Sequence, residues 1–238
     1  MPKAHEALNI WRKTQYERCT SELLCSTGDV LEGAGDLTGA EQLYRQSEES
    51  STRSKDRSGI LASRLSLAKL LIDQANFTGA EQLTRTTLQA FRDESTETSA
   101  LSLLTVLARS LLAQGKAAEA GEVVRQAEAA SRSVKDRCSS LSLSIVEASL
   151  RASSGAPKDV DESVKALSDL SNLASKASCF PVSLDARLAE GEIEAHSGPK
   201  AAGRTHLAAL QTESKRKGFQ LIASQASKAL LWGDKRPD

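Results

Sequence analysis

Aromatic residues are scarce in this chain of 238 residues, where they account for only 3%, and proline occurs only five times. Because proline disrupts helix interiors, the long stretches without it favour helices. Val, Ile and Thr never gather into the alternating apolar runs that are typical of β-strands. These absences predict an all-α fold.

Net charge is also missing, since 31 Lys and Arg residues balance 31 Asp and Glu residues. Without a global field, we expect no nucleic-acid partner and no attraction to anionic membranes. No stretch approaches the roughly 18 apolar residues that a membrane-spanning helix needs. The first residues lack the apolar core of a signal peptide. We therefore expect a protein that neither crosses nor binds a membrane.

Closely spaced cysteines are absent as well. The four cysteines form neither a CxxC pair nor a dense disulfide framework, and they are Cys19, Cys25, Cys138 and Cys179. We therefore expect reduced thiols and a cytoplasmic location. Cys25 is expected in the apolar core. Cys179 is expected in a loop before Pro181, within reach of solvent, and neither thiol has surroundings that would make it catalytic.

What the chain does contain is a repeat. The hexapeptide Thr38–Leu43 recurs letter for letter forty residues later as Thr78–Leu83. The same period extends to five units when they are aligned on the residue before each second helix, which is Gly35, Ala75, Gly115, Gly155 and Gly198. A fixed period of this length is the signature of stacked helical hairpins.

Three further columns follow this period. Seven residues before the turn residue stand small side chains, Gly28, Ala68, Ala108, Ala148 and Gly191. Five residues after it stand Ala40, Ala80, Ala120, Val160 and Gly203. Small residues in both columns would let the two helices of a hairpin approach closely. Four residues further on, the same stripe continues with Tyr44, Thr84, Val124, Val164 and Leu207.

The segments between the helices carry turn signals. We expect the aligned glycines to end each first helix in the left-handed conformation, and Asp36 and Asn76 to cap the second helix. Thr38 and Gly39 are interpreted as its entry turn. The step to the fifth unit gains three residues near 177–181, where we expect Pro181 in a loop and Val182 at the next helix start.

These patterns predict a right-handed α-α superhelix of five hairpins with a capping helix at each end. Each hairpin leaves an apolar face that only its neighbours cover, so we expect an extended array with frayed ends. The predicted segments are an N-terminal cap at 1–16, units at 17–57, 58–97, 98–137, 138–180 and 181–217, and a C-terminal cap with a polar tail at 218–238.

The columns resemble tetratricopeptide repeats in their long variant. They match that family's Gly/Ala-x6-Gly-x4-Ala core, although its signature tryptophan and late proline are absent. Over residues 17–232 the chain is similar to the repeat domains of bacterial regulators of the maltose-operon-activator type. The resemblance implies recognition of a protein or a ligand, in bacterial signalling or transcription regulation, and no enzymatic chemistry. It leaves open whether the chain is complete or the repeat end of a larger regulator.

Sequence motifs for catalysis and cofactors are missing, including phosphate loops, GxGxxG, HExxH and Gly-x-Ser-x-Gly. We therefore expect no enzyme and no cofactor. His196 and His206 share no cysteine or acidic partner at helical ligand spacing, so no metal is expected either. Glu190, Glu192 and Glu194 are interpreted as solvated helix residues.

The concave surface is the candidate binding site. Asp29, Lys69 and Arg109 stand one residue after the small column, and Asp73 stands one turn after Lys69. We hypothesise that Lys69 and Arg109 form a positive ledge for an acidic side chain or chain terminus of a partner peptide. The alternative is a solvated face whose charges balance each other through Asp73.

Two functions fit this surface. A scaffold or adaptor for a protein partner would show a long open groove. A module that senses a small ligand would instead show a closed apolar pocket with a few convergent polar groups. The sequence leaves the oligomeric state open.

Overall fold

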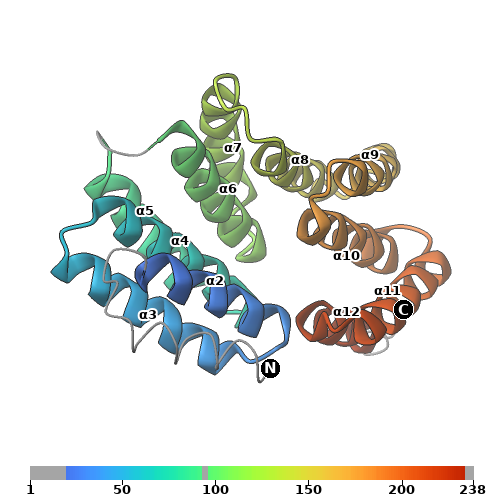
Figure 1. Cartoon of the computed structure of the whole chain (residues 1–238). Coiled ribbons are helices and arrows are strands. Elements are labelled where there is room, and N and C mark those ends of the chain that lie inside the picture. Colours follow the sequence, from blue (N-terminus) through green and yellow to red (C-terminus); the bar gives the residue numbers. More distant parts are fainter. Residues whose placement is uncertain (1–19, 93–95, 234–238) are drawn as a thin grey trace.

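The computed structural model describes residues 20–92 and 96–233, and all regular structure within these ranges is helical (Figure 1). The predicted all-α superhelix is confirmed. The expected C-terminal capping helix is present, whereas the expected N-terminal one at 1–16 lies outside the described residues, and the unit boundaries stay predictions. The helices are α2 (Thr20–Gly33), α3 (Leu37–Arg53), α4 (Arg57–Asp73), α5 (Phe77–Ala90), α6 (Glu97–Ala113), α7 (Ala117–Ser131), α8 (Arg137–Ala152), α9 (Pro157–Lys176), α10 (Phe180–Ser197), α11 (Lys200–Lys217) and α12 (Gln220–Gly233).

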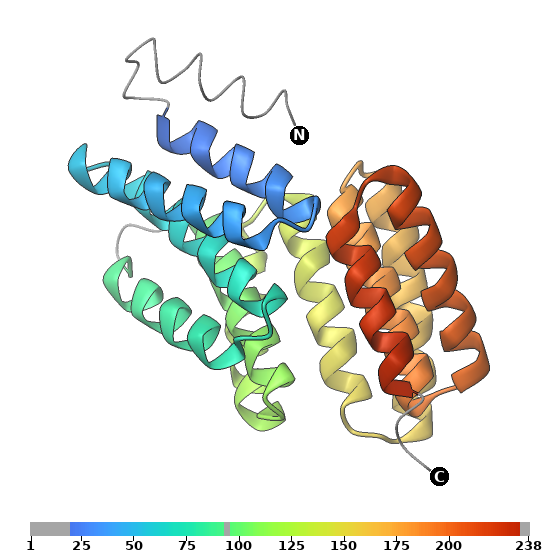
Figure 2. The same cartoon turned by 90° about the horizontal axis from the view of Figure 1, so that it is seen from below.

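The helices form two layers. The even-numbered helices make the inner layer, in which each contacts the next even-numbered one, and the odd-numbered helices pack outside them (Figure 1). The last inner helix, α12, also contacts the first, α2, so that the two ends of the array lie side by side (Figures 1 and 2). The expected extended array is therefore wrong, because the described part of the superhelix closes on itself, and the expected fraying of the ends stays a prediction.

The small columns bring the two helices of each hairpin together, as predicted. All their residues are buried. A Cβ atom on Gly28 would lie 2.4 Å from the Tyr44 ring, and one on Gly191 would lie 2.8 Å from Leu207. The three middle units have alanine at this position and the smaller Thr84, Val124 and Val164 opposite. Glycine thus stands opposite the large Tyr44 and Leu207, and alanine stands opposite the smaller side chains, so the volume between the two helices is nearly constant.

The turn residues adopt the left-handed conformation in four units, with φ of 85° at Gly35, 60° at Ala75, 75° at Gly115 and 71° at Gly155. Gly198 departs from the prediction, with φ −115°. The reason is Pro199, because a proline forces the residue before it into extended backbone. Ala75 adopts a conformation that glycine takes without steric cost.

The helix that contains each repeated hexapeptide is capped by a residue two positions before the hexapeptide. Asp36 Oδ1 accepts a hydrogen bond from the Gly39 N–H at 2.9 Å, and Asn76 does the same for Gly79 at 3.1 Å. Thr38 and Gly39 therefore belong to the first turn of α3 and not to a turn before it, which corrects our interpretation. A Cβ on Gly39 would lie 2.6 Å from Asp36 Oδ2, so glycine leaves room for the capping side chain.

The start of α10 also differs from the prediction. The helix begins at Phe180, and Pro181 occupies its first turn. Proline is tolerated there because the N–H groups of the first turn have no partner within the helix. The loop therefore ends two residues earlier than we expected from Pro181.

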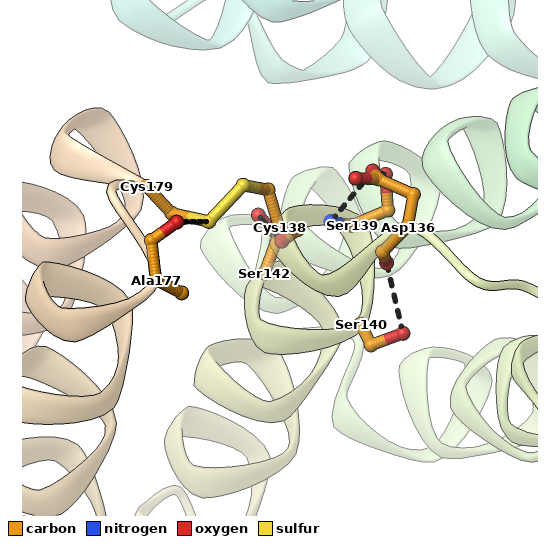
Figure 3. Close-up of a disulfide and its surroundings, with 7 residues drawn as sticks. All are labelled: Asp136, Cys138, Ser139, Ser140, Ser142, Ala177 and Cys179. Atoms are coloured by element: carbon orange, nitrogen blue, oxygen red, sulfur yellow. Dashed lines mark hydrogen bonds between the residues drawn. A yellow bond between two sulfur atoms is a disulfide. The ribbon is translucent and has the colours of Figure 1, made fainter.

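Cys138 and Cys179 form a disulfide (Figure 3), with their Cα atoms 5.6 Å apart. Cys138 lies in the first turn of α8 and Cys179 caps α10, so the bridge joins equivalent places in successive units. The expectation of reduced thiols is wrong for this pair, and Cys179 is only 3% exposed. Spacing rules missed the bridge because its separation of 41 residues is about one repeat.

Cys25 packs against the core of the first unit and is free, as expected. Cys19 lies outside the described residues. Among the described helices, none is long and apolar enough to cross a membrane. The cytoplasmic location stays a prediction, and the Cys138–Cys179 bridge removes the cysteine pattern as support for it.

The strain at Ala75 can be tested with a matched pair of variants. Ala75→Gly should raise the free energy of unfolding by roughly 0.5–1 kcal/mol, because glycine adopts positive φ without the Cβ clash. Gly115→Ala should lower it by roughly 1 kcal/mol, since a Cβ there meets nothing within 4 Å and only the backbone conformation is penalised. Urea unfolding measures both, and equal midpoints for the two variants would contradict the strain.

The disulfide closes a loop of 41 residues, which should stabilise the fold by about 2–4 kcal/mol. Reductant should therefore lower the thermal midpoint of the wild-type protein. A Cys138→Ser/Cys179→Ser variant should unfold at the reduced wild-type midpoint and no longer respond to reductant. A Cys25→Ser variant is the control and should keep the response. Insensitivity of the wild type to reductant would show that the bridge does not form.

Candidate functional site

Charged side chains from the inner helices meet at the centre of the superhelix. We call this set the central cluster. It consists of Asp29 and Glu32 of α2, Lys69 and Asp73 of α4, Arg109 of α6, Asp185 and Glu192 of α10, and Gln225 of α12. All four residues predicted from the sequence, Asp29, Lys69, Asp73 and Arg109, belong to it. Their role in binding stays a prediction.

Tyr44 of α3 anchors the α2 side of the cluster. Its hydroxyl lies 2.7 Å from Asp29 Oδ1 and 2.5 Å from Glu32 Oε2, and its single proton can be donated to only one of them at a time. Burial raises the pKa of Glu32 to about 8, and a hydrogen bond with Asp73 adds to the rise while the one with Tyr44 opposes it. Glu32 is therefore protonated at neutral pH and donates to Asp73.

Asp73 also connects the two ends of the chain. The amide Nε2 of Gln225 donates a hydrogen bond to Asp73 Oδ1 at 2.9 Å, across 152 residues of sequence. Nearby, Gly35 lies against the start of α12, where an added Cβ would be 3.4 Å from Gln220 Cβ. The other amide atom of Gln225, Oε1, is buried and has no hydrogen-bond partner among the described residues. The contact between α4 and α12 thus leaves Gln225 Oε1 as an unused acceptor close to the Asp73 carboxylate.

Arg109 bridges the two halves of the superhelix. Its Nη1 lies 3.6 Å from Asp185 Oδ2, in an ion pair between α6 and α10 with side chains 44% and 34% exposed. Burial lowers the pKa of Arg109, but the carboxylates of Asp185, Asp73 and Glu192 outweigh it and the pKa is raised. The guanidinium therefore stays charged, and its charge is met by the protein's own carboxylates.

Lys69 is exposed on α4. Hydrogen bonds from Ser139 lower the pKa of Asp136 and the charge of Lys69 lowers it further, whereas at Asp185 the same charge only partly offsets a rise in pKa. The proposed ledge of Lys69 and Arg109 is thus flanked by acids from α10 as well as α4. Burial raises the pKa of Asp185, which Arg109 lowers and Asp73 raises further. Burial also raises the pKa of Glu192. With Glu32 protonated, four other carboxyl groups face the two cations Lys69 and Arg109, so the cluster carries an excess of negative charge.

Sequence reasoning missed Glu32, Asp185 and Gln225 of this cluster and the role of Tyr44 beside it, and it interpreted Glu192 only as a solvated helix residue. Glu32 stands three residues after Asp29 and shares its helix face, so helical spacing could have found it. Tyr44 was noticed only as a packing residue. Asp185 and Gln225 reach the cluster because the superhelix closes, and no local pattern in the sequence signals that closure.

A second group of charged residues also differs from the prediction. Glu194 was interpreted as solvated but is only 4% exposed, and its Oε2 lies 2.6 Å from His206 Nδ1. His206 therefore has an acidic partner after all. The spacing rule missed it because Glu194 is on α10 and His206 on α11.

The raised pKa of Glu32 predicts a pH-dependent stability. Between its ordinary pKa of 4.5 and about 8, the folded state binds a proton that the unfolded state has lost, so stability should fall as pH rises through this window. The slope is at most about 1.4 kcal/mol per pH unit for one group. Glu32→Gln, which keeps a neutral hydrogen-bonding side chain, should flatten this dependence, measured by urea unfolding at several pH values.

Glu22→Gln, exposed on the same helix, serves as the control and should leave the pH dependence unchanged. An equal slope in wild type and Glu32→Gln would contradict the protonated Glu32.

Solved structures with similar folds come from Podosopora anserina. One is a protein named as a putative kinesin light chain with nearly identical TPR-like repeats, with a TM-score of 0.50, 18% identity, and coverage of 92% of this chain and 98% of that one. A variant form of the same protein has a TM-score of 0.51, 20% identity, and coverage of 84% and 99%. At these identities the likeness shows the fold alone.

None of the curated proteins compared with the chain shows significant similarity to it. The family model described as the MalT-like TPR region matches residues 3–228, which is nearly the whole chain. The small columns, the hairpin period and the helical fold agree with that match. The chain belongs to the family of MalT-like tetratricopeptide-repeat regions.

Proposed function

We propose that the protein is a non-enzymatic scaffold that binds a positively charged segment of a partner protein at its central cluster. TPR-like repeats generally mediate protein interactions, which supports the scaffold role. A setting in bacterial signalling or transcription regulation, in the cytoplasm, is part of this proposal. The excess of carboxyl groups in the cluster is the observation that indicates a positively charged partner.

The cluster's two cations do not cancel this excess. Arg109 is engaged with Asp185, and Glu32 is neutral at pH 7 because its pKa is about 8. Asp29, Asp73 and Glu192 remain to be balanced, with Lys69 as the other nearby cation. An ammonium or guanidinium group entering the centre would supply this charge, and partial burial would strengthen its attraction relative to bulk water.

The hydrogen-bonding capacity of the site fits the same occupant. The unused Oε1 of Gln225 is a buried acceptor, and the Asp73 carboxylate lies beside the amide that carries it. Lysine offers three donors and arginine five, and neither brings an acceptor that would repel these oxygens. A lysine or arginine side chain of a partner can therefore pair with the exposed carboxylates of Asp29 and Glu192, and it reaches the buried Gln225 Oε1 if that amide moves.

The charge of the partner is tested with peptides of equal length that carry several Lys or Arg, no charge, or several Asp or Glu. Fluorescence anisotropy should show binding of the cationic peptides only, with affinity falling as salt increases. Asp29→Asn/Asp73→Asn should weaken this binding by at least about tenfold, since both negative charges are removed while each side chain keeps one acceptor oxygen. Circular dichroism checks that the variant folds.

Asp161→Asn is the matched control, because Asp161 is exposed on the outer helix α9. It should bind the cationic peptides as the wild type does. Equal losses in both variants would mean that general surface charge, and not the central cluster, attracts the peptides.

The variant Lys69→Glu distinguishes our proposal of a cationic partner from the earlier hypothesis that the ledge binds an acidic partner. Lys69 is exposed, so the substitution changes charge with little effect on packing. It should raise the affinity for the cationic peptides several-fold, because one repulsive charge becomes attractive. A wild-type preference for the acidic peptides that Lys69→Glu abolishes would instead support the ledge and contradict our proposal.

The closure favours a second candidate function, the sensing of a small cationic ligand. Asp73 belongs both to the cluster and to the hydrogen bond that joins α4 to α12, so a ligand amine at Asp73 would compete with Gln225. Thermal shift against a panel of small organic amines and carboxylates tests this function. A saturable shift with one amine that Asp73→Asn removes would favour sensing, and no shift with any amine favours the scaffold.

A further inference from the structure

Three potential metal ligands converge between α10 and α11, away from the central cluster. Glu190, Glu194 and His206 each offer one ligand atom, and these atoms lie within 4.8 Å of one another. Glu190 and Glu194 are one helical turn apart and share a face of α10. His206 faces them from α11, with its Nδ1 2.6 Å from Glu194 Oε2.

Close packing of the two helices brings the imidazole to the carboxylates. A Cβ atom on Gly203 would lie 2.4 Å from the backbone nitrogen of Ala195 and 2.8 Å from Glu194 Cβ. Glycine at 203 therefore lets α11 approach α10 at the level of Glu194. His206 follows three residues later on the same helix, on nearly the same face, so the backbone holds the three side chains together.

A histidine–glutamate pair needs one carboxylate, but two carboxyl groups lie beside the imidazole of His206. Glu194 is 4% exposed, and the imidazole of His206, which is half exposed, already meets its carboxylate. Glu190 adds a second carboxyl group on the same face. Burial raises the pKa of Glu190, the charge of Glu194 raises it further, and His206 and Arg187 lower it. Arg187 is itself bound to Glu213 at 2.8 Å. Two carboxylates thus share one imidazole.

We propose that Glu190, Glu194 and His206 bind a divalent transition-metal ion of the Zn²⁺ class. Imidazole nitrogen and carboxylate oxygen are the ligands that Zn²⁺ takes at about 2.0–2.2 Å. Ligand atoms around a tetrahedral ion of this kind are roughly 3.4 Å apart, so His206 Nδ1 and Glu194 Oε2 must move apart by about 1 Å, which rotation of the half-exposed imidazole allows. The ion replaces the hydrogen bond between His206 and Glu194 and balances both carboxylates.

The half-exposed imidazole places the open coordination positions toward solvent. With three protein ligands, the ion keeps at least one position for water or for a ligand from another molecule. The site is independent of the central cluster, because none of its three residues belongs to that cluster.

Binding is tested on tag-free protein with Zn²⁺ alone, in competition with a fluorescent chelator. We expect one Zn²⁺ per chain from this site, and His206→Ala and Glu194→Gln should each weaken its affinity by at least about tenfold, as loss of a ligand does. Glu194→Gln keeps the buried volume, and His206→Ala changes a half-exposed residue. Co²⁺ gives a second readout, since visible absorption bands should appear in the wild type and vanish in His206→Ala.

His196→Ala is the matched control, since His196 is exposed on the last turn of α10 and lies outside the ligand set. Its Zn²⁺ affinity should stay within about twofold of the wild type. Zn²⁺ binding that is unchanged in His206→Ala, or no binding at free Zn²⁺ up to about 100 µM, would overturn the proposal.

Discussion

The close approach of paired helices at two columns of small residues is the contact on which the rest of the structure depends. Where Tyr44 or Leu207 fills the space, the facing residue is Gly28 or Gly191, and where the filler is smaller, alanine faces it. This compensation keeps successive hairpins alike although their sequences differ. Each inner helix packs against the next, and the stacked hairpins curve until α12 meets α2.

Closure gives the inner surface its chemical character. Charged residues of α2, α4, α6 and α10 are brought together with Gln225 of α12, and desolvation inside the ring raises the pKa values of Glu32, Asp185 and Glu192 although Asp29, Lys69 and Arg109 stay exposed. Arg109 joins opposite walls through Asp185, and Gln225 joins the ends through Asp73. The same residues therefore join the walls and the ends of the ring and form the site proposed for the partner.

The fold was predictable because its information is local and repeated. Small side chains, turn glycines and caps recur every forty residues, and the predicted helical superhelix follows from them. The disulfide and the closure were not predictable, because Cys138 meets Cys179, and Asp73 meets Gln225, only after the units have stacked. For the same reason, the repeat columns indicated Asp29, Lys69, Asp73 and Arg109 but not Asp185. The four predicted residues balance in charge, and the excess of carboxylates in the cluster comes from Asp185 and Glu192, of which Asp185 joins the others only after folding.

The central claim is that the closed ring accepts a cationic group at its centre. Nuclear magnetic resonance of ¹⁵N-labelled protein, titrated with a lysine-containing peptide, tests it most directly because it reports the position of the ligand. The account predicts chemical-shift changes concentrated at Asp29 and Asp73 and at the side-chain amide of Gln225, which gains a partner for its buried oxygen. Changes confined to the outer helices α3, α5, α7, α9 and α11, with the Gln225 side chain unaffected, would contradict it.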